Sequence, residues 1–203
     1  MGERLARSLV GYSFRMAGKS SNKSKRAKAL SSKVVFRGPV FSVVSDQVLE
    51  PGGIRARRDI IRHPGSVVVL AVDESGREPR VLLERQYRYA ANQYLWELPA
   101  GRVDAGEEEK TGAQRELLEE TGYTASSWRR ALKFYVSPGF LDETMAIYLA
   151  RGLRKGKAEP EEDELIRLRF WPLSAALKMI SNDRIVDAKT ITGLLWFACL
   201  GKG

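Results

Sequence analysis

The chain has very few of the residues that form covalent cross-links or zinc sites. Its 203 residues include one cysteine, Cys199, and one histidine, His63. A single cysteine cannot close a disulfide within the chain, so the disulfide-rich secreted class is excluded and a reducing compartment is the default. Because no second thiol or imidazole is present, zinc is also a poor choice of metal for any site. We therefore expect a cytoplasmic protein.

Long apolar runs are missing as well. The longest, residues 193–200, falls far short of the roughly 18 residues that a membrane-spanning helix needs, which predicts a soluble protein without a membrane span. Only eight prolines and 18 glycines are present, and 43% of the residues are hydrophobic. Collagen-like and wholly disordered chains are therefore excluded, and a globular chain of ordinary composition remains.

The net charge of +9 is carried by one end of the chain. Residues 1–37 contain ten Lys or Arg and one Glu, so acidic and basic side chains balance over the remainder. Residues 18–32 offer almost nothing to bury. We therefore expect a basic, disordered arm over residues 1–33, followed by one domain over residues 34–203.

The arm also contains an amphipathic basic pattern. Apolar residues recur at spacings of four, three and four, and they are Leu5, Leu9, Tyr12 and Met16. This pattern is compatible with an organelle transit peptide, an anchor on an anionic surface, an RNA-binding arm or a solvated tail. All four alternatives stay open, and a transit peptide would place the protein in a mitochondrion or plastid instead of the cytoplasm.

Turn signals and hydrophobic patterns in the domain predict a sheet with helices packed on it, which is the α+β class. Strands are expected at residues 40–49, 54–61, 66–72, 80–87, 131–136, 144–150 and 165–171. Helices are expected at residues 108–120 before Gly122, 175–182 after the cap Ser174, and 188–200 after the cap Asp187. The first two strands flank a turn signal, and this predicts an antiparallel hairpin.

Six glutamates stand in a window of fourteen residues, and three of them share one face of a predicted helix. Glu116, Glu119 and Glu120 are three and four residues apart, so their side chains emerge together. Like charges at this spacing cost about 0.2–0.5 kcal/mol per pair unless a cation neutralises them. Carboxylates suit a hard divalent cation, and we expect Mg2+, with Mn2+ as the alternative.

The spacing around this helix resembles the Nudix box. Gly101 is followed after five residues by Glu107, and after seven more by residues 115–123, RELLEETGY. Nine constrained positions agree with the box at the correct gaps. The resemblance implies a Nudix fold, in which a mixed sheet is sandwiched between helices. It further implies metal-dependent hydrolysis of a nucleoside diphosphate linked to another group.

The same resemblance implies a metal site and its support. The implied ligands are Glu116 and Glu120 as the principal pair, Glu119 in the same cluster, and the backbone carbonyl of Ala100. Arg115 is similar to the box arginine that orients the glutamates, and Glu107 is similar to its acidic partner. Glu116, Glu120 and Arg115 are therefore predicted to be catalytic residues.

Segments on either side of the box are similar to the ADP-ribose pyrophosphatase branch of the Nudix superfamily. They are residues 85–88 (RQYR), 96–101 (WELPAG) and 137–143 (SPGFLDE). In that branch a proline follows the box at about the distance found here, where Pro138 lies 15 residues after Tyr123. The implied substrate is ADP-ribose, cleaved to AMP and ribose 5-phosphate. Another nucleotide sugar such as GDP-mannose is the alternative.

Further residues carry over from this branch. Glu143 matches the loop glutamate that serves as general base, on a loop suited to closing over substrate. Arg88 and Arg58 match arginines that contact the substrate. Glu97, a strand-end acid beside the metal site, is also assigned to substrate binding. The single histidine, His63, is expected to be a packing residue, because the proposed chemistry needs no imidazole.

The expected partners follow from the same resemblance. The branch often completes its active site across a dimer interface, which implies a homodimer in which residues 34–61, an antiparallel β extension, contribute to the neighbouring subunit's site. A nucleic acid or anionic surface bound by the basic arm is the remote alternative function. Such an arm would provide affinity but little specificity, because it lacks interleaved aromatic residues.

Overall fold

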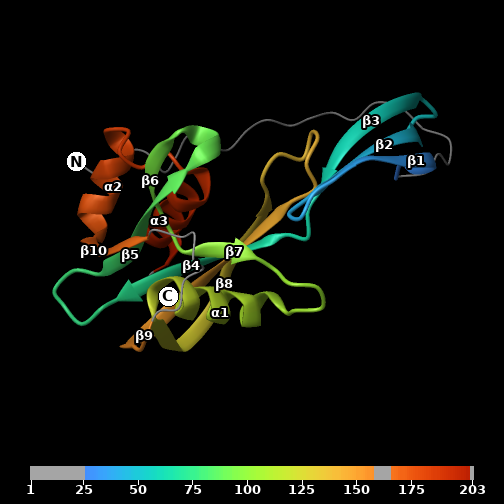
Figure 1. Cartoon of the computed structure of the whole chain (residues 1–203). Helices are drawn as coiled ribbons and strands as arrows, with labels where there is room; N and C mark the ends of the chain where they lie inside the picture. The colour runs from blue at the N-terminus through green and yellow to red at the C-terminus, as the bar shows by residue number, and fades with distance from the viewer. Residues whose placement is uncertain (1–25, 158–165, 202–203) are drawn as a thin grey trace.

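The computed structural model describes residues 26–157 and 166–201. They form a three-stranded sheet and a seven-stranded sheet, and Figure 1 shows the smaller sheet projecting from one end of the body. Most of the predicted basic arm, including its amphipathic pattern, lies outside the described residues. No helix within the described ranges is long and apolar enough to cross a membrane.

The smaller sheet is antiparallel, in the order β1-β2-β3. Its strands are β1 (Lys28–Arg37), β2 (Ser42–Leu49) and β3 (Arg55–Arg62). β2 and β3 form the predicted hairpin, whose turn is closed by a 2.9 Å hydrogen bond from Gly53 N–H to the Glu50 carbonyl. Gly52 and Gly53 have φ values of 101° and 87°, a region that favours glycine over other residues.

The prediction that the chain is disordered through Ser32 is wrong from Lys28 onward. β1 begins there and pairs with β2 along its whole length, from Lys28 opposite Leu49 to Arg37 opposite Ser42. Every residue of β1 is exposed, so its composition carries no burial signal. Backbone hydrogen bonds to β2, which composition does not reveal, supply the order.

The larger sheet is mixed and forms the body. Its strands run in the order β10-β5-β4-β9-β8, with β6 added to β5 and β7 added to β4. β4 and β9 are parallel, whereas the other pairs are antiparallel. The strands are β4 (Ser66–Asp73), β5 (Arg80–Arg88), β6 (Gln93–Glu97), β7 (Ala100–Arg102), β8 (Tyr123–Tyr135), β9 (Thr144–Lys155) and β10 (Arg167–Pro172), and a 3-10 turn (Tyr89–Ala91) follows β5.

Helices cover both faces of this sheet, which confirms the expected layers. α1 (Glu109–Thr121) packs on one face, while α2 (Leu173–Ser181) and α3 (Ala188–Leu200) pack on the other. β4 lies at the centre, where Val67 and Val69 face α1, and Val68 and Leu70 face α2 and α3. Because both faces of β4 are covered, its sequence is a continuous apolar run and does not alternate. This agrees with the strand predicted at residues 66–72.

The helix ends agree with the predicted signals in two cases out of three. Gly122 ends α1 in the left-handed conformation, and the Asp187 side chain accepts a 3.0 Å bond from Thr190 N–H at the start of α3. The predicted Ser174 cap is wrong, because α2 starts earlier, at Leu173. The distant carboxylate of Glu78 accepts from Ser174 N–H at 2.7 Å and satisfies that donor.

Candidate active site

Glu116, Glu119 and Glu120 share one face of α1, and Glu116 and Glu120 lie against the short strand β7. The opposite side of the helix is anchored by Ala113 and Leu117, which are fully buried against the sheet. Helical spacing then directs Glu116 and Glu120 to the inner edge, where both are buried, whereas the Glu119 side chain is 44% exposed. The cluster is thus positioned by ordinary amphipathic packing.

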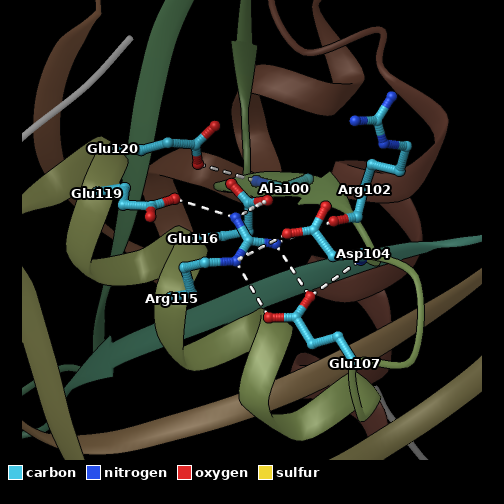
Figure 2. A network of polar contacts seen from close by, with 8 residues as sticks. All are labelled: Ala100, Arg102, Asp104, Glu107, Arg115, Glu116, Glu119 and Glu120. Atoms are coloured by element: carbon cyan, nitrogen blue, oxygen red, sulfur yellow. Dashed lines mark hydrogen bonds and ion pairs between the residues drawn. The ribbon is translucent and has the colours of Figure 1, made fainter. Parts of the chain in front are cut away.

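Arg115 is the centre of the polar network drawn in Figure 2. Its guanidinium donates to both carboxylate oxygens of Glu107 at 3.1 Å, to Glu116 at 2.8 Å and to Glu119 at 3.0 Å. It also donates to the Arg102 carbonyl at 3.0 Å. These hydrogen bonds lower the pKa of the Glu107 carboxyl below its ordinary value. One planar cation therefore holds the loop before α1 and two glutamates of the helix in a fixed arrangement.

Strand β7 approaches the glutamates so closely that a side chain is excluded there. A Cβ atom built on Gly101 would lie 1.9 Å from Glu116 Oε1. Next to it, Ala100 N–H donates to Glu120 Oε2 at 3.1 Å. The backbone of residues 100–101 thus forms one wall of the carboxylate cluster, which accounts physically for the glycine at this position.

The chemistry of these residues fits a hard divalent cation. Carboxylate oxygens are the donors that Mg2+ and Mn2+ prefer, and the close approach at Gly101 leaves the carboxylate of Glu116 against the backbone. Among the described residues, no three acidic, histidine or cysteine side chains converge tightly enough to hold an ion as they stand. Figure 2 shows that the guanidinium of Arg115 contacts Glu116 and Glu119.

A second charged network lies buried beside the first. Arg88 donates from Nε and Nη2 to the two oxygens of Glu97 at 2.9 and 3.1 Å, and Lys189 of α3 bonds to the same carboxylate. Lys189 also pairs with Asp187 at 3.1 Å. Glu97 is only 2% exposed and Lys189 7% exposed. The network joins β5, β6 and the start of α3.

The pKa values within this network show how its charges are maintained. Burial favours the neutral form of Glu97, but the hydrogen bonds from Arg88 and the charge of Lys189 outweigh it, so its pKa lies below the ordinary value. Burial likewise opposes the charge of Arg88, whose pKa is nevertheless raised by Glu97 and by the nearby charges of Glu84 and Glu120. Because Glu120 belongs to the α1 cluster, the two networks meet at Arg88.

Glu143 is held in place at the start of β9. Its Oε1 accepts a 2.6 Å hydrogen bond from Ser66 Oγ and lies 3.7 Å from Nδ1 of His63. The same histidine nitrogen accepts a hydrogen bond from Gly65 N–H at 3.1 Å. The His63 side chain is nearly buried, as a packing residue would be.

The loop before Glu143 is paired with the end of β3. Ile61 N–H donates to the Phe140 carbonyl at 2.8 Å, and Asp142 N–H donates to the Ile61 carbonyl at 3.1 Å. Arg62 adds ion pairs to Asp142 at 3.0 Å and to Asp46 at 3.1 Å. These contacts tie the loop to the smaller sheet.

Arg58 is a predicted site residue that the fold places away from the α1 carboxylates. It lies on β3 in the smaller sheet, where it pairs with Glu50 at 2.5 Å. Sequence reasoning in turn missed Lys189, which contacts Glu97. The signal for it was present, because Lys189 is the only charged residue in the otherwise apolar or small-polar helix α3. A lone charge in such a helix requires a partner.

Comparisons with known proteins agree with this geometry. Residues 62–192 match the model of the NUDIX domain family. The chain is 38% identical over 170 residues to an ADP-ribose pyrophosphatase of Bacillus subtilis, covering 83% of this chain and 90% of the relative. It is 32% identical over 150 residues to a GDP-mannose pyrophosphatase of Salmonella choleraesuis, covering 68% and 75%.

A solved structure shares the fold. The crystal structure of an ADP compounds hydrolase superposes with a TM-score of 0.74, at 22% sequence identity, and covers 88% of this chain and 95% of that one. At this identity the likeness concerns the fold alone. This likeness confirms the expected fold, in which a mixed sheet lies between helices. The antiparallel three-stranded sheet near the N-terminus was also expected, and the strand order confirms it.

Proposed function

The chain belongs to the NUDIX domain family, and from that premise we propose that it is a metal-dependent pyrophosphatase that hydrolyses ADP-ribose to AMP and ribose 5-phosphate. The observation that carries the proposal is the placement of Glu116 and Glu120 against the backbone of residues 100–101, with Glu119 joined to them through Arg115. The match to a relative named ADP-ribose pyrophosphatase covers 90% of that relative, which supports ADP-ribose as the substrate.

The metal ligands in this proposal are Glu116, Glu119 and Glu120, joined by the backbone carbonyl of Ala100. Mg2+ is the proposed ion and Mn2+ the alternative, because all of these donors are oxygen atoms. When bound, such an ion neutralises charge on the pyrophosphate and lowers the pKa of a water molecule. Arg115 orients Glu116 and Glu119 for this role through the hydrogen bonds it makes to them.

Arg88 is the proposed phosphate-binding residue. A guanidinium has five N–H donors, and the two bonds to Glu97 fix its plane while leaving the remaining donors for substrate oxygens. Its side chain is part-exposed, unlike that of Glu97. Glu97 is thus proposed to act on the substrate through Arg88, by setting the direction in which the guanidinium points.

Glu143 is the proposed general base. Its carboxylate accepts a hydrogen bond from Ser66 Oγ, which leaves further lone pairs to accept a proton from the attacking water. Ser66 begins β4, and the same residue pairs with Arg102 of β7 beside the carboxylate wall. This register supports a location for Glu143 at the same end of the sheet as the α1 cluster.

The protein is further proposed to be a homodimer formed through the smaller sheet. Apolar side chains are exposed on it, namely Leu30, Val34, Val35, Phe36, Val40, Phe41 and Ile54. Arg58 lies on this sheet and not at its own chain's carboxylates, so a partner's site is where it would contact substrate. Light scattering of the full chain, with Phe36→Ser as the interface variant, tests the oligomeric state.

A substrate panel tests the activity. ADP-ribose, GDP-mannose, UDP-glucose, NADH and diadenosine polyphosphates are incubated with Mg2+, with Mn2+ and with chelator, and products are separated by chromatography. We expect AMP from ADP-ribose only when metal is present. Absence of turnover on every substrate with either ion would overturn the proposal.

GDP-mannose is the second candidate substrate, favoured by the relative that is named for its hydrolysis. The same panel separates the two by their kcat/KM ratio. Nucleic-acid contact by the basic arm is an accessory proposal only. Removing residues 1–25, which leaves β1 complete, is expected to retain turnover.

A further inference from the structure

A groove lined by arginines is formed by residues of β5, β6, β10 and the turn after α2. Its volume is about 450 Å3, which is within the size range of small-molecule sites. The lining includes three arginines and three large aromatic residues, which are Arg85, Arg169, Arg184, Tyr94, Trp96 and Trp171. We call this surface the arginine groove.

The arginine groove opens on the side of β5 opposite to the carboxylates. Side chains alternate along a strand, so Arg85 and Glu84 point to opposite faces. Leu83 packs with α2 and α3 on one face of the sheet, and Leu82 packs with α1 on the other face. Arg85 shares its face with Leu83. The groove is therefore separate from the proposed catalytic site.

Arginines and aromatic rings stack on one another throughout the groove. The guanidinium carbon of Arg169 lies 4.0 Å from the ring centroid of Trp171, and that of Arg184 lies 5.9 Å from it. Arg85 stands 4.8 Å from the centroid of Tyr94. Tyr94 is 54% exposed, so its ring offers an apolar surface to a ligand. Cation–π contact with these rings restricts the guanidinium groups before any ligand binds.

The charge of these arginines is not balanced by carboxylates in the described part of the chain. Eight other arginines there make ion pairs with Asp or Glu, namely Arg57, Arg58, Arg62, Arg80, Arg88, Arg115, Arg130 and Arg151. Arg85, Arg169 and Arg184 have aromatic partners instead. Of the groove residues, only Asp183 is acidic. The groove therefore presents positive charge that an anionic ligand would neutralise.

We propose that the arginine groove binds a nucleoside phosphate, at a site distinct from the pyrophosphatase centre. The phosphate is bound by Arg169 and Arg184, whose planar forks match phosphate oxygens, and the base stacks on Tyr94. Inorganic phosphate alone would leave the aromatic surface unused. The volume of the groove suits a mononucleotide. This inference goes beyond the proposed hydrolysis and does not depend on it.

The test is a calorimetric titration of the full chain with AMP in the presence of chelator. Adenosine and ribose 5-phosphate serve as half-ligands, and a short oligothymidylate distinguishes a nucleic acid strand from a free nucleotide. The groove variant is Arg169→Gln/Arg184→Gln, in which two exposed residues are changed. The matched control is Arg154→Gln, an exposed arginine on β9 that does not line the groove.

We expect AMP to bind more tightly than either half-ligand and more tightly than the oligonucleotide. The groove variant should weaken AMP by at least about tenfold, while Arg154→Gln leaves it unchanged. Tyr94→Ala should weaken AMP but not ribose 5-phosphate. Metal-dependent turnover by the groove variant should stay within about twofold of the parent, since no proposed catalytic group is altered.

Three results would overturn the proposal. AMP binding that is lost in Arg88→Gln but kept in the groove variant would place AMP in the catalytic site. Equal affinity for AMP and ribose 5-phosphate would remove the nucleoside from the proposal. Residues 159–164 contain five acidic residues. If AMP bound only after these five were changed to serine, the chain's own carboxylates would be what neutralises the groove.

Discussion

The two glutamate–arginine networks have similar chemistry and different exposure. The α1 network centres on Arg115, whose side chain is 28% exposed and contacts three glutamates. The β6 network centres on Glu97, which is almost completely buried between Arg88 and Lys189. One contains an excess of carboxylates around a single cation. In the other, two cations contact the buried carboxylate of Glu97, and one of them, Lys189, also pairs with Asp187.

This difference in exposure implies a difference in role. Charges near water interact weakly, so the ion pair between the part-exposed Arg115 and Glu119 can be exchanged at small cost. In the β6 network Glu97 and Lys189 have lost their hydration, and removal of either leaves the other poorly compensated in the interior. We therefore interpret the α1 network as the part that exchanges ligands and the β6 network as the part that fixes Arg88.

The largest expected effect is on activity, in the α1 network. Glu120→Gln keeps an oxygen that can accept from Ala100 N–H, so the fold should persist while the proposed metal ligand is lost. We expect kcat/KM with Mg2+ to fall by at least about 10³-fold. Steady-state kinetics and thermal unfolding measure the two quantities. Glu108→Gln, an exposed neighbour without a side-chain cap bond, is the control. Full activity in Glu120→Gln would refute the metal assignment.

The next effect is on stability, in the β6 network. Lys189→Met removes one of the two cations that contact the buried Glu97, and we expect the free energy of unfolding to fall by about 3 kcal/mol. Lys178→Met, an exposed lysine on α2, should change it by less than about 0.5 kcal/mol. Adding Glu97→Gln to Lys189→Met should recover part of the loss. Denaturant unfolding of the parent, the two single variants and the double variant measures these changes. Equal losses of unfolding free energy for Lys189→Met and Lys178→Met would refute the distinction between the networks.

The cost of Lys189→Met should also depend on pH. Because the folded pKa of Glu97 is depressed, its charge stabilises the protein above the unfolded pKa of about 4.3, and this contribution is lost as pH falls through the folded value. A protonated Glu97 needs no counter-ion. The stability gap between parent and variant should therefore be widest near neutral pH and should narrow below about pH 4, as Glu97 becomes protonated in the folded protein. Unfolding curves measured across this range would contradict the assignment if the gap stayed constant.

The contrast also explains how much the sequence could predict. Glu116, Glu119 and Glu120 lie within one helical turn, and their spacing alone places them on one face. The partners of the β6 network are 92 residues apart in the chain, so the contact between Glu97 and Lys189 requires the packed fold. The strands show the same limit. β4 was predicted from its apolar run, but β6 and β7 were missed, because both are short and pair only at the ends of β5 and β4.

The smallest expected effect comes from Arg115→Lys. An ammonium is a compact group and cannot span Glu107, Glu116 and Glu119 at once, so the glutamates lose their fixed orientation although the charge is kept. We expect kcat to fall by about tenfold and the free energy of unfolding by no more than about 1 kcal/mol, because the network is part-exposed. Arg130→Lys, which alters a single exposed ion pair with Glu109, is the matched control for both measurements. A loss of stability as large as that of Lys189→Met would mean that the α1 network is a structural core like the β6 network. The separation of the two roles would then fail.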